Sequence, residues 1–159
     1  MIGLRVLALA VCAMGLANVA DAADVQLKAA DGTRLLAQRE GSGATGVVLV
    51  HADGGSSADW KSFVGRLSSN GYHVLALDLR GHGGSKPPAS ASPADYLAME
   101  QDVDAATAWL RKNGAESVTV IGASLGANVA LAAAGGNDQI DSVVMISPTL
   151  TANGVEASA

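Results

Sequence analysis

The chain has 159 residues, of which 49% are hydrophobic and 16% are charged, so it is long and apolar enough to fold as one domain with a buried core. Its net charge of −5, with no cluster of lysine or arginine, argues against a nucleic-acid-binding surface. Only 3% of the residues are aromatic, which leaves alanine, valine and leucine to fill most of that core.

The N-terminus has the pattern of an export signal. Arg5 supplies a positive charge, an apolar stretch covers residues 6–17, and Ala20-x-Ala22 offers a cleavage site near Ala22. The apolar stretch is shorter than the roughly 20 residues that cross a membrane, which disfavours the alternative of a membrane anchor. We therefore expect a signal peptide at residues 1–22 and an exported chain, periplasmic or secreted, with no stable membrane span after cleavage.

The only cysteine of the sequence, Cys12, lies inside this signal. Lipidation at Cys12 is an alternative, but Val11 is bulkier than the small residue that precedes such a cysteine. The mature chain, residues 23–159, is therefore expected to contain no disulfide, thiol nucleophile or zinc-thiolate site.

In the mature chain, predicted strands alternate with predicted helices. Residues 25–40 form two alternating runs around Asp31-Gly32, a dipeptide that favours a hairpin turn. Three apolar runs then predict strands buried on both faces, at residues 46–51, 73–79 and 117–123. A fourth run predicts a strand at residues 141–147, whose apolar residues would form an exposed edge if the chain is a fragment. The intervals predict helices from Trp60 to about Asn70, from the Ser92 cap to about Asn113, and over residues 125–134. This order predicts an α/β fold, a mostly parallel sheet with helices on both faces.

The sequence Gly-Ala-Ser-Leu-Gly, residues 122–126, joins the third of these strands to the last helix. In this context Gly-x-Ser-x-Gly places the serine on a sharp strand-to-helix turn, with its hydroxyl above the edge of the sheet. The alternative is a glycine-rich phosphate loop, but the sequence has neither Gly-Lys-Ser/Thr nor the third glycine of a dinucleotide-binding motif. We therefore interpret Ser124 as a nucleophile, and we expect no metal or organic cofactor.

A serine nucleophile of this kind needs two backbone N–H groups directed at the oxyanion that forms during acyl transfer. Leu125 follows Ser124 at the start of a helix, where the helix dipole also favours negative charge. The second donor is expected in the polar loop after the first buried strand, from Ala52 or Asp53. His51 begins that loop, and we predict that it supports the loop by hydrogen bonding rather than by transferring protons.

A second loop, residues 78–85, follows the next buried strand and contains Asp78, Arg80 and His82. Asp78 and Arg80 are predicted to pair and to brace this loop, whose glycines permit tight turns. His82 is the most obvious alternative base, because its loop lies at the carboxyl edge of the sheet, but we interpret it as a rim or structural residue. His73 begins a strand, and we interpret it as structural too.

These three motifs resemble those of the α/β-hydrolase family, in the serine hydrolase branch with a histidine-led oxyanion loop and a Gly-x-Ser-x-Gly nucleophile elbow. The resemblance extends from Val25 to Thr149 and implies that Ser124 is the nucleophile and Leu125 an oxyanion donor. Ala52 departs from the pattern, because relatives carry glycine directly after the histidine. The resemblance implies hydrolysis of a carboxylic ester, with a small-molecule ester or acyl compound as substrate, since epoxide and haloalkane hydrolases of this family use aspartate as the nucleophile. A serine nucleophile does not separate an esterase from a thioesterase, an amidase or a peptidase.

The resemblance also implies that an acid and then a histidine follow the nucleophile. All three histidines precede Ser124, and the later carboxylates Asp138, Asp141 and Glu156 do not fit the acid position. We therefore expect an N-terminal part of a longer exported hydrolase, incomplete at the C-terminus, without its catalytic acid and histidine and nearly inactive. Two alternatives are a self-sufficient enzyme that uses His82 as its base and a non-catalytic binding or interaction module with the same fold.

Overall fold

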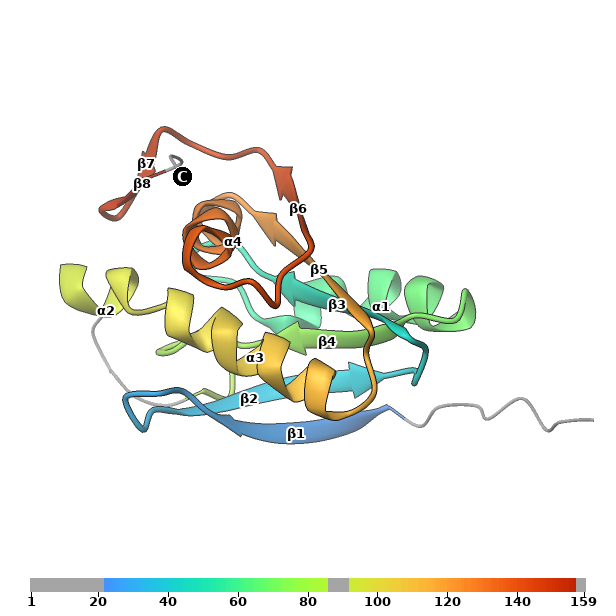
Figure 1. The fold of residues 1–159 in the computed structure, drawn as a ribbon. Helices are drawn as coiled ribbons and strands as arrows, with labels where there is room; N and C mark the ends of the chain where they lie inside the picture. Colours follow the sequence, from blue (N-terminus) through green and yellow to red (C-terminus); the bar gives the residue numbers. More distant parts are fainter. Residues whose placement is uncertain (1–21, 86–91, 157–159) are drawn as a thin grey trace, which may run out of the picture.

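The computed structural model describes residues 22–85 and 92–156, so all of the predicted signal peptide except Ala22 lies outside the described residues (Figure 1). A six-stranded sheet forms the centre of the molecule, in the order β1-β2-β4-β3-β5-β6. Its strands are β1 (Ala23–Lys28), β2 (Arg34–Glu40), β3 (Thr45–Val50), β4 (His73–Leu77), β5 (Ser117–Ala123) and β6 (Ser142–Ile146). β1 and β2 form the predicted hairpin and pair antiparallel, as do β2 and β4, whereas β4, β3, β5 and β6 run parallel. The predicted α/β class with a mostly parallel sheet is confirmed.

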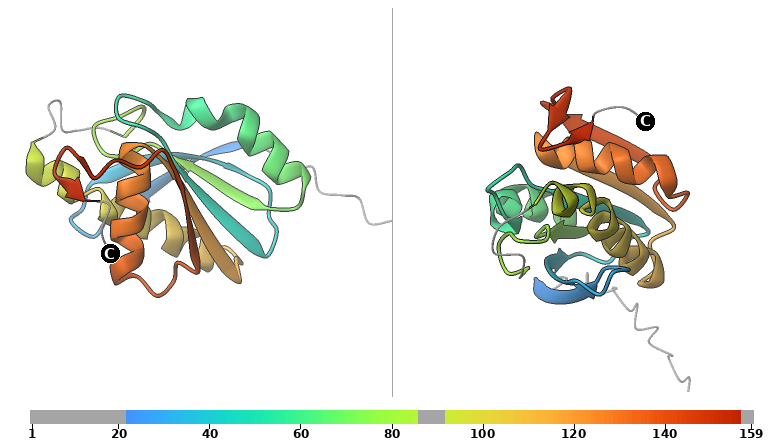
Figure 2. Two further views of the ribbon diagram at one scale, coloured as in Figure 1. Left: turned by 90° about the horizontal axis from the view of Figure 1, so that it is seen from above. Right: turned by 90° about the vertical axis from the view of Figure 1, so that its left-hand side faces the viewer.

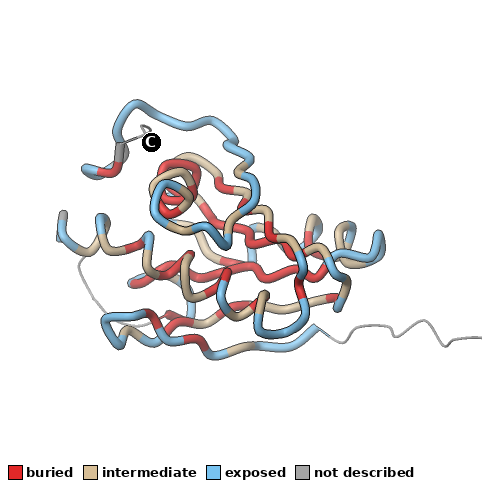
Figure 3. The backbone as a smooth tube through the Cα atoms, viewed as in Figure 1, coloured by how far each residue is buried: buried red, intermediate tan, exposed pale blue. Residues whose placement is uncertain are grey.

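Helices cover both faces of this sheet. α3 (Glu100–Lys112) and α4 (Leu125–Gly136) lie side by side on one face, whereas η1 (Ser57–Trp60) and α1 (Lys61–Ser69) lie on the other (Figure 2). Between these layers the inner strands β3 and β4 are buried, as Figure 3 shows. The alternation of side chains along β4 divides the core, because Leu75 faces α3 and α4 whereas Val74 faces α1.

The single helix predicted from Ser92 to about Asn113 is divided in the structure. α2 (Pro93–Leu97) begins at the predicted Ser92 cap, and a two-residue turn separates it from α3. In this turn the Met99 N–H bonds to the carbonyl three residues earlier at 3.2 Å, and the Met99 side chain is fully buried. Burial of this side chain thus accompanies a tighter turn where the sequence pattern predicted a continuous helix.

After β6 the chain turns back across α4 and forms a small hairpin of β7 (Thr151–Ala152) and β8 (Val155–Glu156) (Figure 1). Asn128 of α4 is fully buried and holds this segment in place. Its amide nitrogen donates to the carbonyls of Thr149 and Val155 at 3.0 and 2.8 Å, and its amide oxygen accepts the Thr149 N–H at 3.3 Å. These bonds fix the hairpin beside the N-terminal half of α4.

His73 lies at the amino-terminal edge of the parallel strands, where β4 begins. It is 2% exposed, and neither of its ring nitrogens has a hydrogen-bond partner among the described residues. Its ring packs edge-on against Trp109, with 5.5 Å between the ring centroids. Burial, and after it the positive charge of Arg39, lowers the pKa of His73. The fold therefore favours the neutral ring.

We expect this histidine to make the folded state less stable in mild acid. Its pKa is lower in the folded chain than its ordinary value of 6.5, so protonation favours unfolding as the pH falls below that value. His73→Phe keeps an aromatic ring against Trp109 and removes the titrating group. Urea unfolding at about pH 7.5 and about pH 5 should show a smaller pH-dependent loss in this variant.

Part of the loss is expected to remain in His73→Phe, because burial lowers the pKa of His51 as well. A loss of the same size in the variant and in the natural chain would show that His73 does not contribute to the pH dependence. Comparison at the higher pH separates this effect from any change that the new ring makes to packing.

Candidate active site

Ser124 lies where β5 ends and α4 begins (Figure 1). Its backbone has φ 51° and ψ −117°, a region that residues with a side chain rarely adopt. Its N–H donates to the carbonyl of Ile146 on β6 at 2.9 Å, and its carbonyl accepts the N–H groups of Ala127 and Asn128 at 2.9 and 3.3 Å. The sheet on one side and the helix on the other thus hold Ser124 in this strained conformation.

Gly122 and Gly126, on either side of Ser124, allow the strand and the helix to approach closely. An ideal Cβ at Gly122 would lie 2.1 Å from the carbonyl oxygen of Gly126. One at Gly126 would lie 2.5 Å from the carbonyl oxygens of both Val50 and His51. The start of α4 therefore presses against the end of β3, and the loop after β3 begins next to the Ser124 turn.

Leu125 is the first residue of α4, so its N–H has no carbonyl partner within the helix. Its side chain is buried in the core, which fixes the position of this N–H group. The positive end of the helix dipole lies at the same place. The arrangement offers one hydrogen-bond donor and a favourable potential for an oxyanion beside Ser124.

His51 follows β3 and is buried. Its Nε2 accepts the N–H of Leu79 at 3.1 Å, so the proton of the neutral ring is on Nδ1, which donates to the carbonyl of Ala52 at 2.7 Å. Burial, more than any other cause, lowers the pKa of His51 and favours this neutral form. With both ring nitrogens engaged, His51 joins the loop after β3 to the loop after β4.

Ala52 and Asp53 lie in the turn that follows His51, where the Gly55 N–H bonds to the carbonyl of Ala52 at 3.0 Å. The Asp53 side chain is 48% exposed. Its Oδ2 accepts a hydrogen bond from the Asn153 side chain, in the hairpin of β7 and β8, at 2.9 Å. The turn keeps both candidates for the second oxyanion donor in the loop that adjoins Ser124.

The predicted pair of Asp78 and Arg80 is wrong, because each residue has other partners. Asp78 accepts the N–H of Ser57 at 2.6 Å and the N–H of Gly84 at 2.7 Å. These two bonds join the start of η1 to the loop of residues 78–85. Backbone N–H groups therefore satisfy the Asp78 carboxylate, which leaves Arg80 free to pair elsewhere.

Arg80 bonds instead to α3 and to the hairpin of β1 and β2. Its Nη2 donates to Asp102 Oδ1 at 2.6 Å, its backbone N–H donates to Asp102 Oδ2 at 2.8 Å, and its Nη1 donates to Asp31 at 2.7 Å. The Arg80 and Asp102 side chains are 4% and 0% exposed. Burial raises the pKa of Asp102, and the hydrogen bonds from Arg80 oppose this shift. A fully buried carboxylate without a cationic partner is strongly destabilising, so Arg80 pairs with Asp102 rather than with Asp78.

His82 lies on the rim of the same edge, with its side chain 12% exposed. Its Nδ1 lies 3.0 Å from the carbonyl oxygen of Arg80, and its Nε2 lies 3.5 Å from Asp53 Oδ1. Its ring centroid is 5.0 Å from that of His51. His82 thus contacts residues of both loops, the one after β3 and the one after β4.

All three histidines of the chain lie in the described residues, and none of their hydrogen bonds involves Ser124. Asp141, one of the later carboxylates, accepts hydrogen bonds from the Val118 N–H and from Arg111, both at 2.6 Å, at the edge of the sheet opposite Ser124. Within residues 22–85 and 92–156, the fold therefore brings together the candidate nucleophile, a helix N-terminus and two polar loops, without a hydrogen-bonded base.

Sequence reasoning did not single out two residues that shape this edge, Asn128 and Asn153. Asn128 is the only polar side chain in α4, at position i+4 from Ser124, and an isolated polar residue in such a helix is a signal of an internal hydrogen bond. Asn153 has φ 50° and precedes Gly154, which is typical of a turn. Its contact with Asp53, 100 residues earlier in the chain, depends on the tertiary fold and has no local signal.

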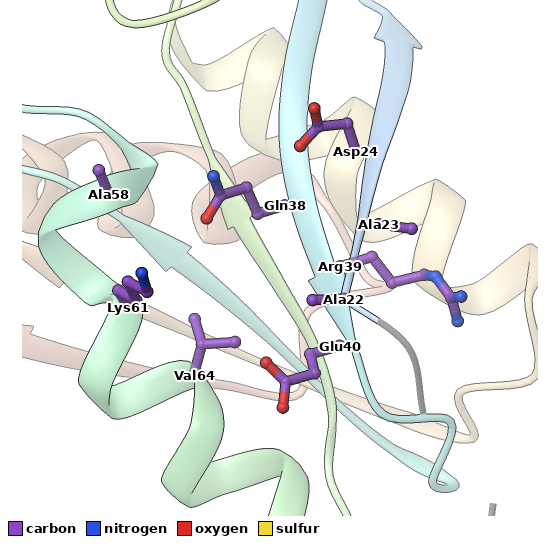
Figure 4. Close-up of a pocket in the computed structure, with 9 residues that line it drawn as sticks. All are labelled: Ala22, Ala23, Asp24, Gln38, Arg39, Glu40, Ala58, Lys61 and Val64. Carbon is purple, nitrogen blue, oxygen red and sulfur yellow. The ribbon is translucent and has the colours of Figure 1, made fainter. Parts of the chain in front are cut away.

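A cavity of about 480 Å³ lies away from this edge, between β2 and α1 (Figure 4). The residues that line it include Gln38, Glu40, Lys61 and Val64, and none of the predicted site residues is among them. In the part of the chain that the structure describes, no group of three or more histidine, cysteine, aspartate or glutamate side chains is arranged to hold a metal ion. The helices of that same part are all too short or too polar to cross a membrane.

The chain belongs to the alpha/beta hydrolase fold family, whose model matches residues 46–158. Among curated proteins, it is 32% identical over 128 residues to the dihydrolipoyllysine-residue acetyltransferase component of the acetoin cleaving system of Cupriavidus necator, covering 80% of this chain and 33% of that protein. It is 34% identical over 100 residues to epoxide hydrolase A of Mycobacterium tuberculosis, covering 62% of this chain and 30% of that protein. The chain thus spans about a third of the length of these relatives.

Two similar solved structures are hydrolases. An esterase of Pyrococcus furiosus superposes with a TM-score of 0.73 at 26% identity, covering 81% of this chain and 53% of that chain. An epoxide hydrolase from an endophytic Streptomyces superposes with a TM-score of 0.67 at 29% identity, covering 78% of this chain and 36% of that chain. The family is therefore established, and the reaction has to be inferred from the site.

Proposed function

We propose that this protein hydrolyses carboxylic esters of small molecules, with Ser124 as the nucleophile. The observation that carries the proposal is a serine in the strained turn between β5 and α4, directly before the first N–H of the helix. Similarity to the esterase of Pyrococcus furiosus supports acyl transfer. The epoxide hydrolases share the fold, but a serine at the turn favours ester hydrolysis over a reaction that uses aspartate in this family.

In this proposal the Ser124 hydroxyl attacks the ester carbonyl and gives its proton to a general base. The carbonyl oxygen becomes an oxyanion that accepts hydrogen bonds from the N–H of Leu125 and from that of Ala52 or Asp53. The ester C–O bond then breaks, the alcohol leaves with the proton from the base, and the acyl group remains on Ser124. Water attacks this acyl-enzyme, its proton passes through the base to the Ser124 oxygen, and the carboxylic acid is released.

The chain's own histidines are not placed to be that base. His51 holds two loops together with both ring nitrogens, and those of His82 face Arg80 and Asp53. A positioned general base contributes about 10²–10⁴ to the rate of such a reaction. We therefore propose that the 159-residue chain by itself turns esters over slowly.

We expect imidazole added to the solution to replace the missing base in part. Hydrolysis of 4-nitrophenyl acetate should rise with imidazole concentration in the natural chain by more than it rises with Ser124→Ala. The difference between the two proteins reports the Ser124-dependent reaction, because free imidazole hydrolyses the ester equally in both samples. A fluorophosphonate probe followed by mass spectrometry should place the covalent adduct on Ser124.

The Ser124→Ala variant is the matched control, since it keeps the turn and removes only the hydroxyl. Identical imidazole dependence in both proteins, together with a probe that leaves Ser124 unlabelled, would reject the proposed nucleophile. Rapid Ser124-dependent turnover without imidazole that is lost in His82→Ala would instead support the self-sufficient enzyme.

A non-catalytic binding module is the second candidate, favoured by the observation that no histidine is hydrogen-bonded to Ser124. For such a module, ligand binding is expected to be unchanged in Ser124→Ala and the imidazole-dependent increment to be absent.

A further inference from the structure

The Asp53 carboxylate lies where three segments of the chain meet. It belongs to the loop after β3, its Oδ2 accepts from Asn153 of the β7–β8 hairpin at 2.9 Å, and its Oδ1 lies 3.5 Å from Nε2 of His82. Burial raises the pKa of the Tyr96 hydroxyl in α2, and the negative charge of Asp53 raises it further. α2 and the hairpin lie on the same side of the molecule in Figures 1 and 2.

The charge of this carboxylate is not neutralised by a permanent cation. Among the described residues its one ion pair is with His82, which is charged only when protonated. Its hydrogen-bond partner, the Asn153 side chain, is a neutral amide. By contrast, Asp78 accepts two backbone N–H groups and Asp102 pairs with Arg80. Asp53 therefore presents a negative charge to solvent, with its side chain 48% exposed.

The same residue adjoins the place where the oxyanion is proposed to form. The N–H of Asp53 is a candidate for the second oxyanion donor, and the loop is pressed against the start of α4, where Gly126 meets the carbonyls of Val50 and His51. A fixed carboxylate beside a developing oxyanion raises the energy of the transition state through like-charge repulsion. A positive charge on the substrate is attracted to the same carboxylate, and this attraction offsets the repulsion between the carboxylate and the oxyanion.

We propose that this site takes esters whose acyl or alcohol part carries an ammonium group, bound by the Asp53 carboxylate. Anionic esters are disfavoured at the same place. This inference rests on the proposed ester hydrolysis for the identity of the substrate, but the recognition of charge is a property of Asp53 alone.

The test compares two esters of nearly equal shape and different charge, acetylcholine and 3,3-dimethylbutyl acetate. Their dissociation constants for the 159-residue chain are measured by NMR titration, in the natural chain and in Asp53→Asn. We expect the cationic ester to bind roughly fivefold to tenfold more tightly than the neutral one in the natural chain, about the effect of one partly screened charge at contact. In Asp53→Asn, which keeps a polar side chain toward Asn153 and His82, the two constants should become nearly equal.

Asp138→Asn is the matched control, because it removes one exposed carboxylate from the opposite edge and changes the net charge equally. The preference should persist in this control and should weaken with added salt. Equal binding of the two esters by the natural chain, no binding of either ester, or a preference that survives in Asp53→Asn would overturn the inference. Binding does not require the Ser124 hydroxyl, so Ser124→Ala should keep the preference for the cationic ester. A failed hydrolysis assay would therefore count against the proposed reaction and not against charge recognition by Asp53.

Discussion

Replacing Gly126 with alanine is expected to be among the most damaging single changes in this protein, at a cost of about 3 kcal/mol or more in the free energy of unfolding. The added Cβ would lie 2.5 Å from two carbonyl oxygens, those of Val50 and His51. Both oxygens belong to the end of a central strand, so they cannot move aside as the tip of a flexible side chain does. Urea unfolding followed by circular dichroism measures the loss directly.

Gly135→Ala in the same helix is the matched control. Apart from its chain neighbours and the backbone of its own helix, no described heavy atom lies within 4 Å of the position that its Cβ would take, and alanine is favoured over glycine in a helix by up to about 1 kcal/mol. This variant is therefore expected to be neutral or slightly more stable. A loss of similar size in both variants would show that the close approach of α4 to β3 is not what Gly126 provides. Labelling of Ser124 by the fluorophosphonate probe should be lost in Gly126→Ala, together with stability, and should be kept in Gly135→Ala.

The parts of this fold that sequence predicted best are those controlled by local patterns. The buried strands have continuous apolar runs because both faces of the inner strands are covered by helices. The hairpin follows from Asp31-Gly32, where Gly32 adopts φ 92° and the Gly32 N–H closes the turn on Ala29 at 2.9 Å. The position of Ser124 between strand and helix was predictable for the same reason, since the glycines, the strand and the helix are adjacent in the chain.

Contacts between distant segments were less predictable. Arg80 has an opposite charge two residues away in Asp78, and local reasoning pairs these two residues. The structure instead joins Arg80 to Asp102 and Asp31, 22 and 49 residues away, because packing of α3 and of the β1–β2 turn brings their carboxylates to the guanidinium. The break before α3 has a similar origin, since burial of Met99 is decided by the core and not by helical periodicity.

Removal of the Asp102 carboxylate is expected to cost about 3–5 kcal/mol of stability, because it leaves the buried Arg80 charge without its main partner. Asp102→Ala removes the acceptor of both the Arg80 guanidinium and the Arg80 backbone N–H. Asp31→Ala removes the other partner of the same guanidinium, but its side chain is 36% exposed, so a loss of about 1 kcal/mol or less is expected. Urea unfolding at neutral pH compares the two variants.

The double variant Arg80→Met with Asp102→Leu separates loss of an ion pair from loss of packing. Replacing both charges with apolar side chains of similar size removes the unpaired charge, and most of the stability lost in Asp102→Ala should return. Recovery is expected to be incomplete by about 1–3 kcal/mol, because the Arg80 backbone N–H still lacks the acceptor that Asp102 provided. Equal losses in Asp31→Ala and Asp102→Ala would contradict this account, since burial then would not decide the cost of removing either carboxylate. A double variant as unstable as Asp102→Ala would instead show that Asp102 acts mainly by fixing the backbone of the loop after β4.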